Sequence, residues 1–317
     1  MSFQEVRQDS AEPRAGPDVR PGSLRAWTIA LRPRSMLLAV SPVIVAVALV
    51  RMRTGMLSIG MLTLALCVAV LMQAITNLQN DAGHTARGGS GRSRHAGLPR
   101  ATTRGLLTVN QVRILIFVCV ALAVATGLPM VLQRGWPVLA IGLASIAAAL
   151  AYMGGPRPIA YTPFGEAFVF VFFGLVATAG TDYVIVGEVP PTSTWIAASA
   201  LGLLSAAALL VNNCRDVDHD AAIGRRTLPI VIGQPAARRL YAAAVLLPFC
   251  VVFAIAWVNR SPGLLAPLLV LPVALKLARD FSACQTGGAH NAILLRTFGL
   301  ALLFAVGLVA GTLTVSR

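Results

Sequence analysis

The sequence has few charged residues and almost no lysine. Only 12% of the 317 residues are charged, and Lys276 is the single lysine. A soluble domain usually carries about 25% charged residues. By contrast, 56% of the residues are hydrophobic and the mean hydropathy is +0.76. This composition excludes an ordinary soluble protein and predicts one integral membrane body, although the length alone would allow two soluble domains.

Cysteine pairs of the metal-binding or disulfide type are also lacking. The chain has five cysteines, and none of them forms a C-x-x-C motif. Most lie in or beside apolar runs, so we interpret them as small buried apolar residues and not as a disulfide framework or a zinc site. They are Cys67, Cys119, Cys214, Cys250 and Cys284.

No soluble basic domain accompanies the net charge of +14. In a membrane protein with several spans, an excess of arginine collects in cytoplasmic loops. We therefore expect contact with the lipid bilayer and no nucleic-acid partner.

The first 24 residues lack the apolar core of a cleavable signal peptide. They are rich in polar residues, proline and glycine, which predicts a disordered cytoplasmic tail, with the membrane domain in residues 25–317.

Apolar runs recur along the rest of the chain, and most reach the roughly 20 residues that a helix needs to cross a bilayer. They predict an all-α membrane bundle of about nine helices. The first run is long enough only if it starts near Leu24 and bends at Pro33. The predicted spans are residues 25–50, 56–79, 112–133, 136–153, 164–186, 194–213, 238–258, 262–279 and 293–314.

Arginine is distributed unevenly between alternate loops. The N-terminal segment and the loops after the second, fourth and sixth spans hold most of it, whereas the opposite loops hold little. The positive-inside rule then places the N-terminus in the cytoplasm and the C-terminus outside. We expect a multi-pass protein of the cell's inner (plasma) membrane.

Two matching motifs follow the second and sixth spans. Asn77 and Asp81 form the first N-x-x-x-D, and Asn212 and Asp216 form the second, which Asp220 extends by another four residues. Residues four apart share one face of a helix. Four spans separate the motifs, so both should lie on the same side of the membrane and face one pocket.

Carboxylate and amide oxygens of this kind suit Mg²⁺, which is usually held by a few carboxylates together with substrate phosphates. Nearby arginines suit phosphate oxygens. The pattern therefore predicts a magnesium–diphosphate site that opens into an apolar bundle. The alternative is a solvated loop whose acids balance Arg225 and Arg226. That alternative explains less, because the spacing occurs twice on one side.

Several segments resemble the UbiA superfamily of membrane prenyltransferases over nearly the whole chain after residue 24. The most diagnostic is "AYMGGPRPIAYTPFGEAFVFVFFGLVATAGTDYV" in residues 151–184. The pattern of this segment is similar to that of the branch of the superfamily that prenylates 1,4-dihydroxy-2-naphthoate in menaquinone biosynthesis. The segments "ALRPRSMLLAVSPVIV", "NNCRDVDHDAAIGRRTLPIVIG" and "NAILLRTFGLALLFAVGLVAG" also resemble this family.

The resemblance implies transfer of a polyprenyl group from its diphosphate to an aromatic acceptor, with Mg²⁺ as cofactor and loss of CO₂ from the ring. It implies catalytic and metal-facing roles for Asp81, Asp216 and Asp220, supported by Asn77 and Asn212. Candidate substrate contacts are Tyr152 at the end of the fourth span, Arg157 after that span, Arg100 in the first loop, and Arg226 and His84 beside the two motifs.

The first motif departs from the family pattern. His84 stands where the family has a second aspartate, and a third carboxylate is missing. Imidazole is a poor ligand for a hard cation, so one of two expected metal sites should be weakened. Three interpretations stay open: an active enzyme in which His84 binds the diphosphate, a prenyltransferase for another aromatic acceptor, and a non-catalytic isoprenoid- or quinone-binding protein.

A transporter is the alternative from another class. Transporter sites usually lie near the middle of the bilayer, whereas the acids here cluster at helix ends on one side, which favours the enzyme.

Overall fold

The computed structural model describes residues 19–88, 99–284 and 287–314, and these residues form helices and loops without any strand. The predicted all-α membrane bundle is confirmed. Within these ranges, eight helices are long and apolar enough to cross a bilayer. The protein is therefore a multi-pass membrane protein.

The spans lie close to the predicted ranges. The first is α1 (Leu24–Leu31), the short η1 (Pro33–Ser35) and α2 (Met36–Thr54); α3 (Ile59–Ala86), α4 (Val109–Arg134) and α5 (Trp136–Met153) follow. After η3 (Ile159–Tyr161), the next span combines α6 (Gly165–Val169), the π-helical η4 (Phe170–Val176) and α7 (Ala177–Val186). Then come α8 (Thr192–Arg215), α9 (Val217–Ala222), α10 (Leu228–Ile232), α11 (Gln234–Val258), η5 (Pro262–Val270), α12 (Leu271–Ala283) and α13 (Gly287–Leu313).

Prolines explain the two irregular spans. The predicted bend at Pro33 is present: α1 ends at Leu31, and Arg32 takes a left-handed conformation with φ of 51°. The predicted span over residues 262–279 is divided between a 3₁₀ helix that contains Pro267 and the α-helix α12, so it is not one continuous spanning helix. Proline lacks the amide hydrogen that an α-helix needs in its interior.

The predicted tail of residues 1–24 falls largely in residues 1–18, outside the described residues. The described part, from residue 19 onward, already belongs to the fold. Val19 packs against a core cluster, and the Gly22 amide donates to the Leu106 carbonyl at 2.9 Å. Residues of the 19–24 segment, which the prediction assigns to the tail, thus pack onto the fold.

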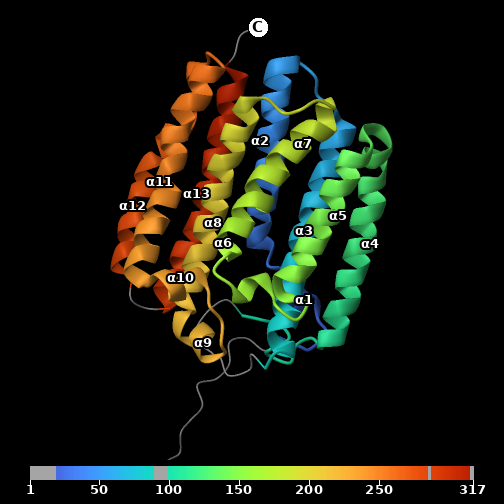
Figure 1. Ribbon diagram of the computed structural model, residues 1–317, viewed down its shortest axis with the longest axis vertical. Coiled ribbons are helices and arrows are strands. Elements are labelled where there is room, and N and C mark those ends of the chain that lie inside the picture. The colour runs from blue at the N-terminus through green and yellow to red at the C-terminus, as the bar shows by residue number, and fades with distance from the viewer. Residues whose placement is uncertain (1–18, 89–98, 285–286, 315–317) are drawn as a thin grey trace, which may run out of the picture.

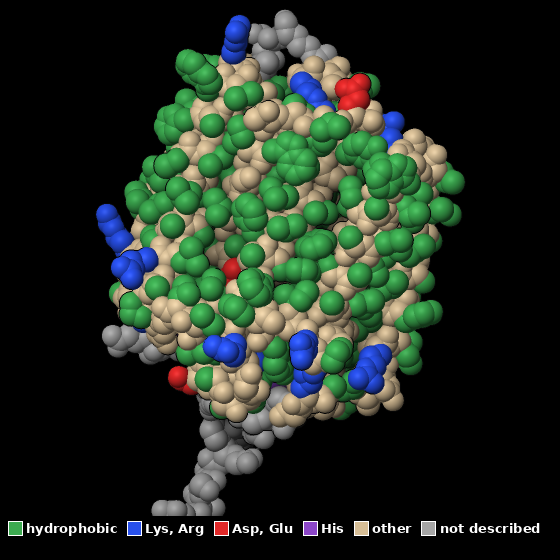
Figure 2. All heavy atoms as spheres, in the orientation of Figure 1, with side chains coloured by type: hydrophobic (Ala, Val, Ile, Leu, Met, Phe, Trp, Pro, Cys, Tyr) green, Lys and Arg blue, Asp and Glu red, His purple; other side chains and the backbone are tan. Residues whose placement is uncertain are grey.

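The elements that carry the two motifs meet at one end of the bundle, which we call the motif end. Figure 1 shows α1, α9 and α10 at this end, with the last turn of α3 and the chain entering α4 beside them. The C-terminus lies at the opposite end. Figure 2 shows mostly hydrophobic side chains across the middle of the visible face, with Lys and Arg side chains along the lower rim and others at the upper rim and the left edge. That distribution is expected of a surface in contact with lipid.

Small residues let α8 pack in the centre of one half of the bundle. It is the most buried of the spanning helices and contacts α2, α11, α13 and the α6–α7 span. Gly174 of η4 crosses it at Gly202: a Cβ built on Gly174 would lie 2.4 Å from the Gly202 Cα and 2.7 Å from the Ala198 carbonyl oxygen. Helices in a bilayer associate through close packing of this kind, because lipid provides no hydrophobic driving force between them.

An ion pair joins three helices at the opposite end. Arg53 of α2 donates two hydrogen bonds, both 2.6 Å long, to the two oxygens of the buried Asp182 of α7. The Thr194 hydroxyl of α8 donates to the same carboxylate at 2.6 Å. Because the carboxylate is fully paired, it can be buried without a large desolvation cost.

Replacing Gly174 with alanine should destabilise the bundle. The added methyl group has no room against Gly202, and overpacking of this kind typically costs about 1–3 kcal/mol. Thermal denaturation of the purified protein in detergent would measure the change. Gly299→Ala in α13 is the matched control, because nothing lies within 4 Å of a Cβ there. Equal melting temperatures for the two variants would contradict the close crossing.

Candidate functional site

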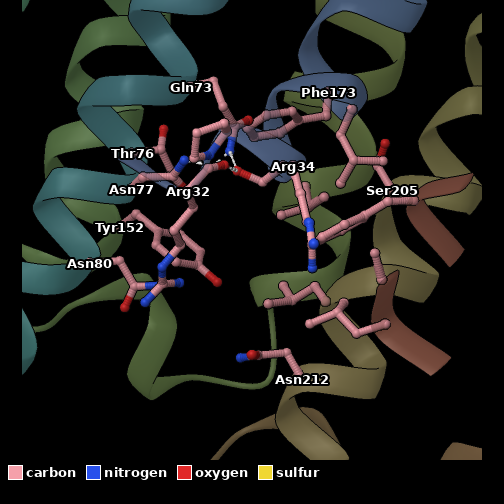
Figure 3. Close-up of a pocket in the computed structure, with 18 of the residues that line it drawn as sticks. Arg32, Arg34, Gln73, Thr76, Asn77, Asn80, Tyr152, Phe173, Ser205 and Asn212 are labelled. Atoms are coloured by element: carbon pink, nitrogen blue, oxygen red, sulfur yellow. Dashed lines mark hydrogen bonds between the residues drawn. The ribbon is translucent and has the colours of Figure 1, made fainter. Parts of the chain in front are cut away.

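A large cavity opens at the motif end and extends into the bundle. Its volume is about 650 Å³, and residues of α1, α2, α3, α5, α6, α8 and α13 line it. Its apolar wall includes Phe168, Phe172, Phe298 and Leu209. In Figure 3, Arg32, Asn80 and Tyr152 lie on one side and Asn212 on another, with the Arg34 side chain between them. The cavity therefore combines a polar, basic mouth with an apolar interior.

Asn77 holds the break between α1 and α2. Its side-chain amide donates to the Leu31 carbonyl at 2.7 Å and to the Ser35 hydroxyl at 2.8 Å, and its own carbonyl accepts from Gln73 at 3.1 Å (Figure 3). A helix end leaves backbone carbonyls without partners, and Asn77 satisfies one of them. This network fixes the turn that brings Arg32 and Arg34 into the cavity wall.

Asp81 is buried, and its side chain holds the loop that leads into α4. The amides of Ala101 and Thr102 each donate to it at 2.9 Å, and the Thr102 hydroxyl donates a further short hydrogen bond. A carboxylate offers about four lone-pair sites, so three are engaged by this loop. Its predicted role as a metal ligand stays a prediction, and any such role must compete with these donors.

The second motif surrounds a guanidinium group. Arg215 donates from Nε and Nη2 to the two oxygens of Asp216, each at 2.8 Å. Nη2 also donates to the Asn212 side-chain carbonyl at 2.6 Å, and Nη1 donates to that of Asn291 in α13 at 2.7 Å. Three oxygens of the predicted metal-binding motif thus converge on one buried cation.

Asp220 is buried one helical turn further on. Its Oδ1 accepts from Arg225 at 2.9 Å, and its Oδ2 has no hydrogen-bond partner among the described residues. Burial raises the pKa of this carboxyl, although the Arg225 charge acts in the opposite direction. Arg225 also lies over the Tyr161 ring, 4.6 Å from its centroid. The free oxygen of Asp220 is available to a further cation.

Side chains from the two motifs meet. The rings of His84 in α3 and His219 in α9 are stacked, with centroids 5.6 Å apart. Arg100 is buried near the same place, and two of its nitrogens lack partners among the described residues. Burial lowers the pKa of Arg100 to about 9 with help from the Arg32 and Arg225 charges, whereas Asp216 and Asp81 act to raise it. The guanidinium stays protonated at neutral pH and faces both motifs.

The remaining predicted residues are placed differently. Tyr152 lines the cavity, but Arg157 and Arg226 are exposed, and Arg225 occupies the buried position instead. Four further arginines belong to the site that the sequence did not single out: Arg32, Arg34, Arg215 and Arg225. The available signal was a positively charged residue beside each polar motif. The sequence does not show which of several adjacent arginines points into the site, because that depends on the path of the backbone.

The donor set fits a hard cation held together with a phosphate ligand. Among the described residues, no three His, Cys, Asp or Glu side chains converge on a ready-made metal centre. Mg²⁺ needs no such cage, since it is often bound by one or two carboxylates plus phosphate oxygens. The convergent oxygens of Asn212 and Asp216 and the open oxygen of Asp220 match that requirement.

A second, more apolar cavity adjoins the first. Its volume is about 280 Å³, and it lies among α2, α3, α4, α5, η4 and α7. Ser145, Phe172 and Phe173 line both cavities. The interior of the bundle therefore continues from the polar mouth past two phenylalanines into a space whose wall is almost entirely apolar.

Comparison with known proteins identifies close relatives. The 1,4-dihydroxy-2-naphthoate octaprenyltransferase of Mycobacterium tuberculosis is 33% identical over 303 residues, covering 92% of this chain and 97% of the relative. The enzyme of the same name from Escherichia coli is 33% identical over 228 residues, covering 70% and 73% of the two chains.

Solved structures share the fold. A UbiA homologue from Archaeoglobus fulgidus bound to DMAPP and Mg²⁺ superposes with a TM-score of 0.65 at 16% identity, covering 92% of this chain and all of that chain. An apo UbiA homologue from Aeropyrum pernix gives a TM-score of 0.66 at 14% identity, covering 86% of this chain and 96% of that chain.

The profile of the UbiA prenyltransferase family matches residues 39–298, which include both motifs and the cavity between them. The match covers most of the chain, and the similarity to the Mycobacterium tuberculosis enzyme extends over 92% of it. This chain therefore belongs to the UbiA prenyltransferase family and is a membrane prenyltransferase.

Proposed function

We propose that this prenyltransferase transfers a polyprenyl group from its diphosphate to 1,4-dihydroxy-2-naphthoate, with loss of the ring carboxylate as CO₂. The observation that carries the proposal is that Asn77 and Asn212, one from each motif, line one largely apolar cavity with Arg32 and Arg34, while Asp216 and Asp220 are buried against arginines at the same end of the bundle. The activity named for the relatives at 33% identity supports the choice of acceptor.

The diphosphate would bind at the polar mouth. Asn212, Asp216 and Asp220 would hold Mg²⁺, which supplies positive charge to the leaving diphosphate. Arg32, Arg34 and Arg100 add fixed positive charge around it, which stabilises the charge that develops as the carbon–oxygen bond breaks.

The chemistry joins the allylic carbon to the electron-rich ring. The bond from that carbon to the diphosphate oxygen breaks, and diphosphate leaves. The ring carbon that carries the carboxylate bonds to the allylic carbon. The carboxylate then departs as CO₂, and the electron pair of its bond returns to the ring and restores aromaticity. Phe168, Phe172 and Phe298 line the place where the allylic carbon would lie. They keep water from capturing the cation. Tyr152 lies between this wall and the polar mouth, where it can orient either substrate.

The isoprenoid tail would extend past Phe172 and Phe173 into the second cavity. The wall there has the apolar character of the tail, and the two spaces share residues. We place the motif end on the cytoplasmic side of the plasma membrane, because the arginine-rich loops belong to it. The N-terminus is then cytoplasmic.

Asp216→Ala should abolish product formation, because it removes the carboxylate at the centre of the second motif. Losses of at least about 100-fold are typical when one such electrostatic group is removed. Membranes containing the protein would be incubated with polyprenyl diphosphate, dihydroxynaphthoate and Mg²⁺, and mass spectrometry would detect the prenylated, decarboxylated product.

Asp218→Ala is the control, because Asp218 is exposed two residues away. If wild-type membranes bind the diphosphate but yield no such product, the acceptor is a different aromatic compound or the protein only binds isoprenoids. Equal activity of Asp216→Ala and wild type would refute the diphosphate site.

Two substitutions separate the possible roles of Asp81. Thr102→Val removes one donor of the loop and leaves the carboxylate intact, whereas Asp81→Asn removes the charge and keeps one acceptor oxygen. If Asp81 binds metal, only Asp81→Asn should lower the affinity for Mn²⁺ measured by electron paramagnetic resonance in the presence of pyrophosphate. If both variants lose activity and keep the wild-type Mn²⁺ affinity, Asp81 acts through the loop instead.

Gly142→Leu should restrict the length of the donor. Gly142 lines the second cavity, and nothing lies within 4 Å of a Cβ there, so a leucine side chain can start from this position and take up space that the tail would need. We expect kcat/KM to fall at least about tenfold for a long polyprenyl diphosphate and to change little for geranyl diphosphate. Gly60→Leu, at an equally open position in the first turn of α3, is the control. Equal losses for both donors would contradict the tail site.

A further inference from the structure

We propose that Arg215 is an exchangeable counter-ion: it holds the oxygens of the second motif before substrate binds, and it moves onto the diphosphate when metal and diphosphate enter together. The inference rests on the proposed function, because it assumes that a metal–diphosphate ligand uses this site. It assigns to Arg215 a role that neither the motif spacing nor the fold requires.

The contacts of Arg215 are those of a cation in an oxygen cage. Its Nε and Nη2 reach both oxygens of Asp216 at 2.8 Å, and Nη2 reaches Asn212 Oδ1 at 2.6 Å. Only 2% of its side chain is exposed, and 4% of the Asp216 side chain. These same oxygens belong to the motif that the sequence assigns to metal binding. The guanidinium therefore occupies the coordination positions that a divalent cation needs.

The two cations cannot share this cage. A divalent ion among the oxygens of Asp216 and Asn212 would lie beside the guanidinium in a buried place, where repulsion between like charges is strong. Moving Arg215 away with no new partner would leave a buried charge unpaired, which is costly. Binding of the metal alone is therefore opposed, and it becomes favourable only when an anion can receive the guanidinium.

The diphosphate can serve as that anion. Arg215 is the last residue of α8, one turn beyond Asn212, which lines the cavity. Its planar fork matches phosphate oxygens as well as it matches a carboxylate. A short rotation of this long side chain would carry the guanidinium from Asp216 toward the cavity mouth. Metal and diphosphate should then bind cooperatively, since each removes the obstacle to the other.

The exchange also reaches α13. Arg215 Nη1 donates to Asn291 at 2.7 Å, and Leu294, Leu295 and Phe298, one to two turns further along α13, line the cavity. When Arg215 leaves, α8 and α13 lose this link at the motif end. The α13 wall of the cavity therefore loses this link to α8 when metal and diphosphate bind together, and not when metal binds alone.

The test uses the full chain in detergent, with Mn²⁺ as the metal probe and inorganic pyrophosphate as the anion. Electron paramagnetic resonance measures free Mn²⁺, and calorimetry measures pyrophosphate binding. Wild type should bind Mn²⁺ weakly alone and much more tightly with pyrophosphate. Arg215→Gln should bind Mn²⁺ alone about tenfold more tightly, bind pyrophosphate about tenfold more weakly, and lose most of the coupling between them.

Two variants serve as controls. Arg215→Lys keeps a positive charge beside Asp216, so its affinity for Mn²⁺ alone should stay low, which separates loss of charge from loss of packing. Arg239→Gln removes an exposed arginine at the start of α11 and should match wild type. Melting temperatures would verify that every variant is folded.

The inference is overturned if Arg215→Gln binds Mn²⁺ alone no more tightly than wild type, because Arg215 is then a fixed structural partner of Asp216. It is also overturned if wild type binds Mn²⁺ and pyrophosphate independently. The proposed function survives both results. By contrast, a wild-type protein that binds neither probe would contradict the diphosphate site itself, and the inference with it.

Discussion

A carboxylate buried at the edge of a bilayer must be paired with hydrogen-bond donors, and this requirement determines how the motif end is built. Asp81 recruits the backbone of the loop before α4, Asp216 recruits Arg215, and Asp220 recruits Arg225. The first pairing ties the loop before α4 to α3, the second holds the end of α8, where Arg215 also bonds Asn291 of α13, and the third closes the turn after α9. Because carboxylates cost more to bury than amides or hydroxyls, these three positions have the strongest influence on the local fold.

The same pairings leave the site ready for an anionic substrate. Arg32, Arg34 and Arg100 add an excess of positive charge around the mouth of the cavity. A diphosphate brings several negative charges and many acceptor oxygens, so it complements this excess. The apolar interior behind the mouth then selects ligands that carry a long hydrocarbon tail.

Much of this architecture follows from composition and spacing. Apolar runs of about 20 residues predicted the spans, and Pro33 predicted the bend between α1 and α2. The repeat of N-x-x-x-D predicted that α3 and α8 bring their ends to one site, and the stacked rings of His84 and His219 are consistent with it. These features depend on local periodicity, which the sequence displays directly.

Other features depend on the path of the backbone in space. Arg225 and Arg226 are adjacent and chemically identical, but a turn after α9 directs Arg225 inward and leaves Arg226 exposed. The prediction that Asp81 binds metal rests on the face of α3 that its spacing specifies, and spacing cannot show that the loop at Ala101 and Thr102 folds back onto that face. The 262–279 run is likewise divided between a 3₁₀ helix and an α-helix, because prolines alter the local hydrogen bonding. A hydropathy pattern does not show this effect.

The π-helical segment η4 changes the direction in which side chains point along a single membrane crossing. Its wider turn rotates α7 relative to α6 about the helix axis. Phe168 of α6 lines the large cavity at the motif end, whereas Asp182 of α7 must meet Arg53 at the opposite end. The two ends of this crossing thus satisfy different partners although one continuous chain links them. Deleting one residue from η4 would bring the crossing closer to a uniform α-helix. The chain could then keep Phe168 at the cavity or Asp182 against Arg53, but not both.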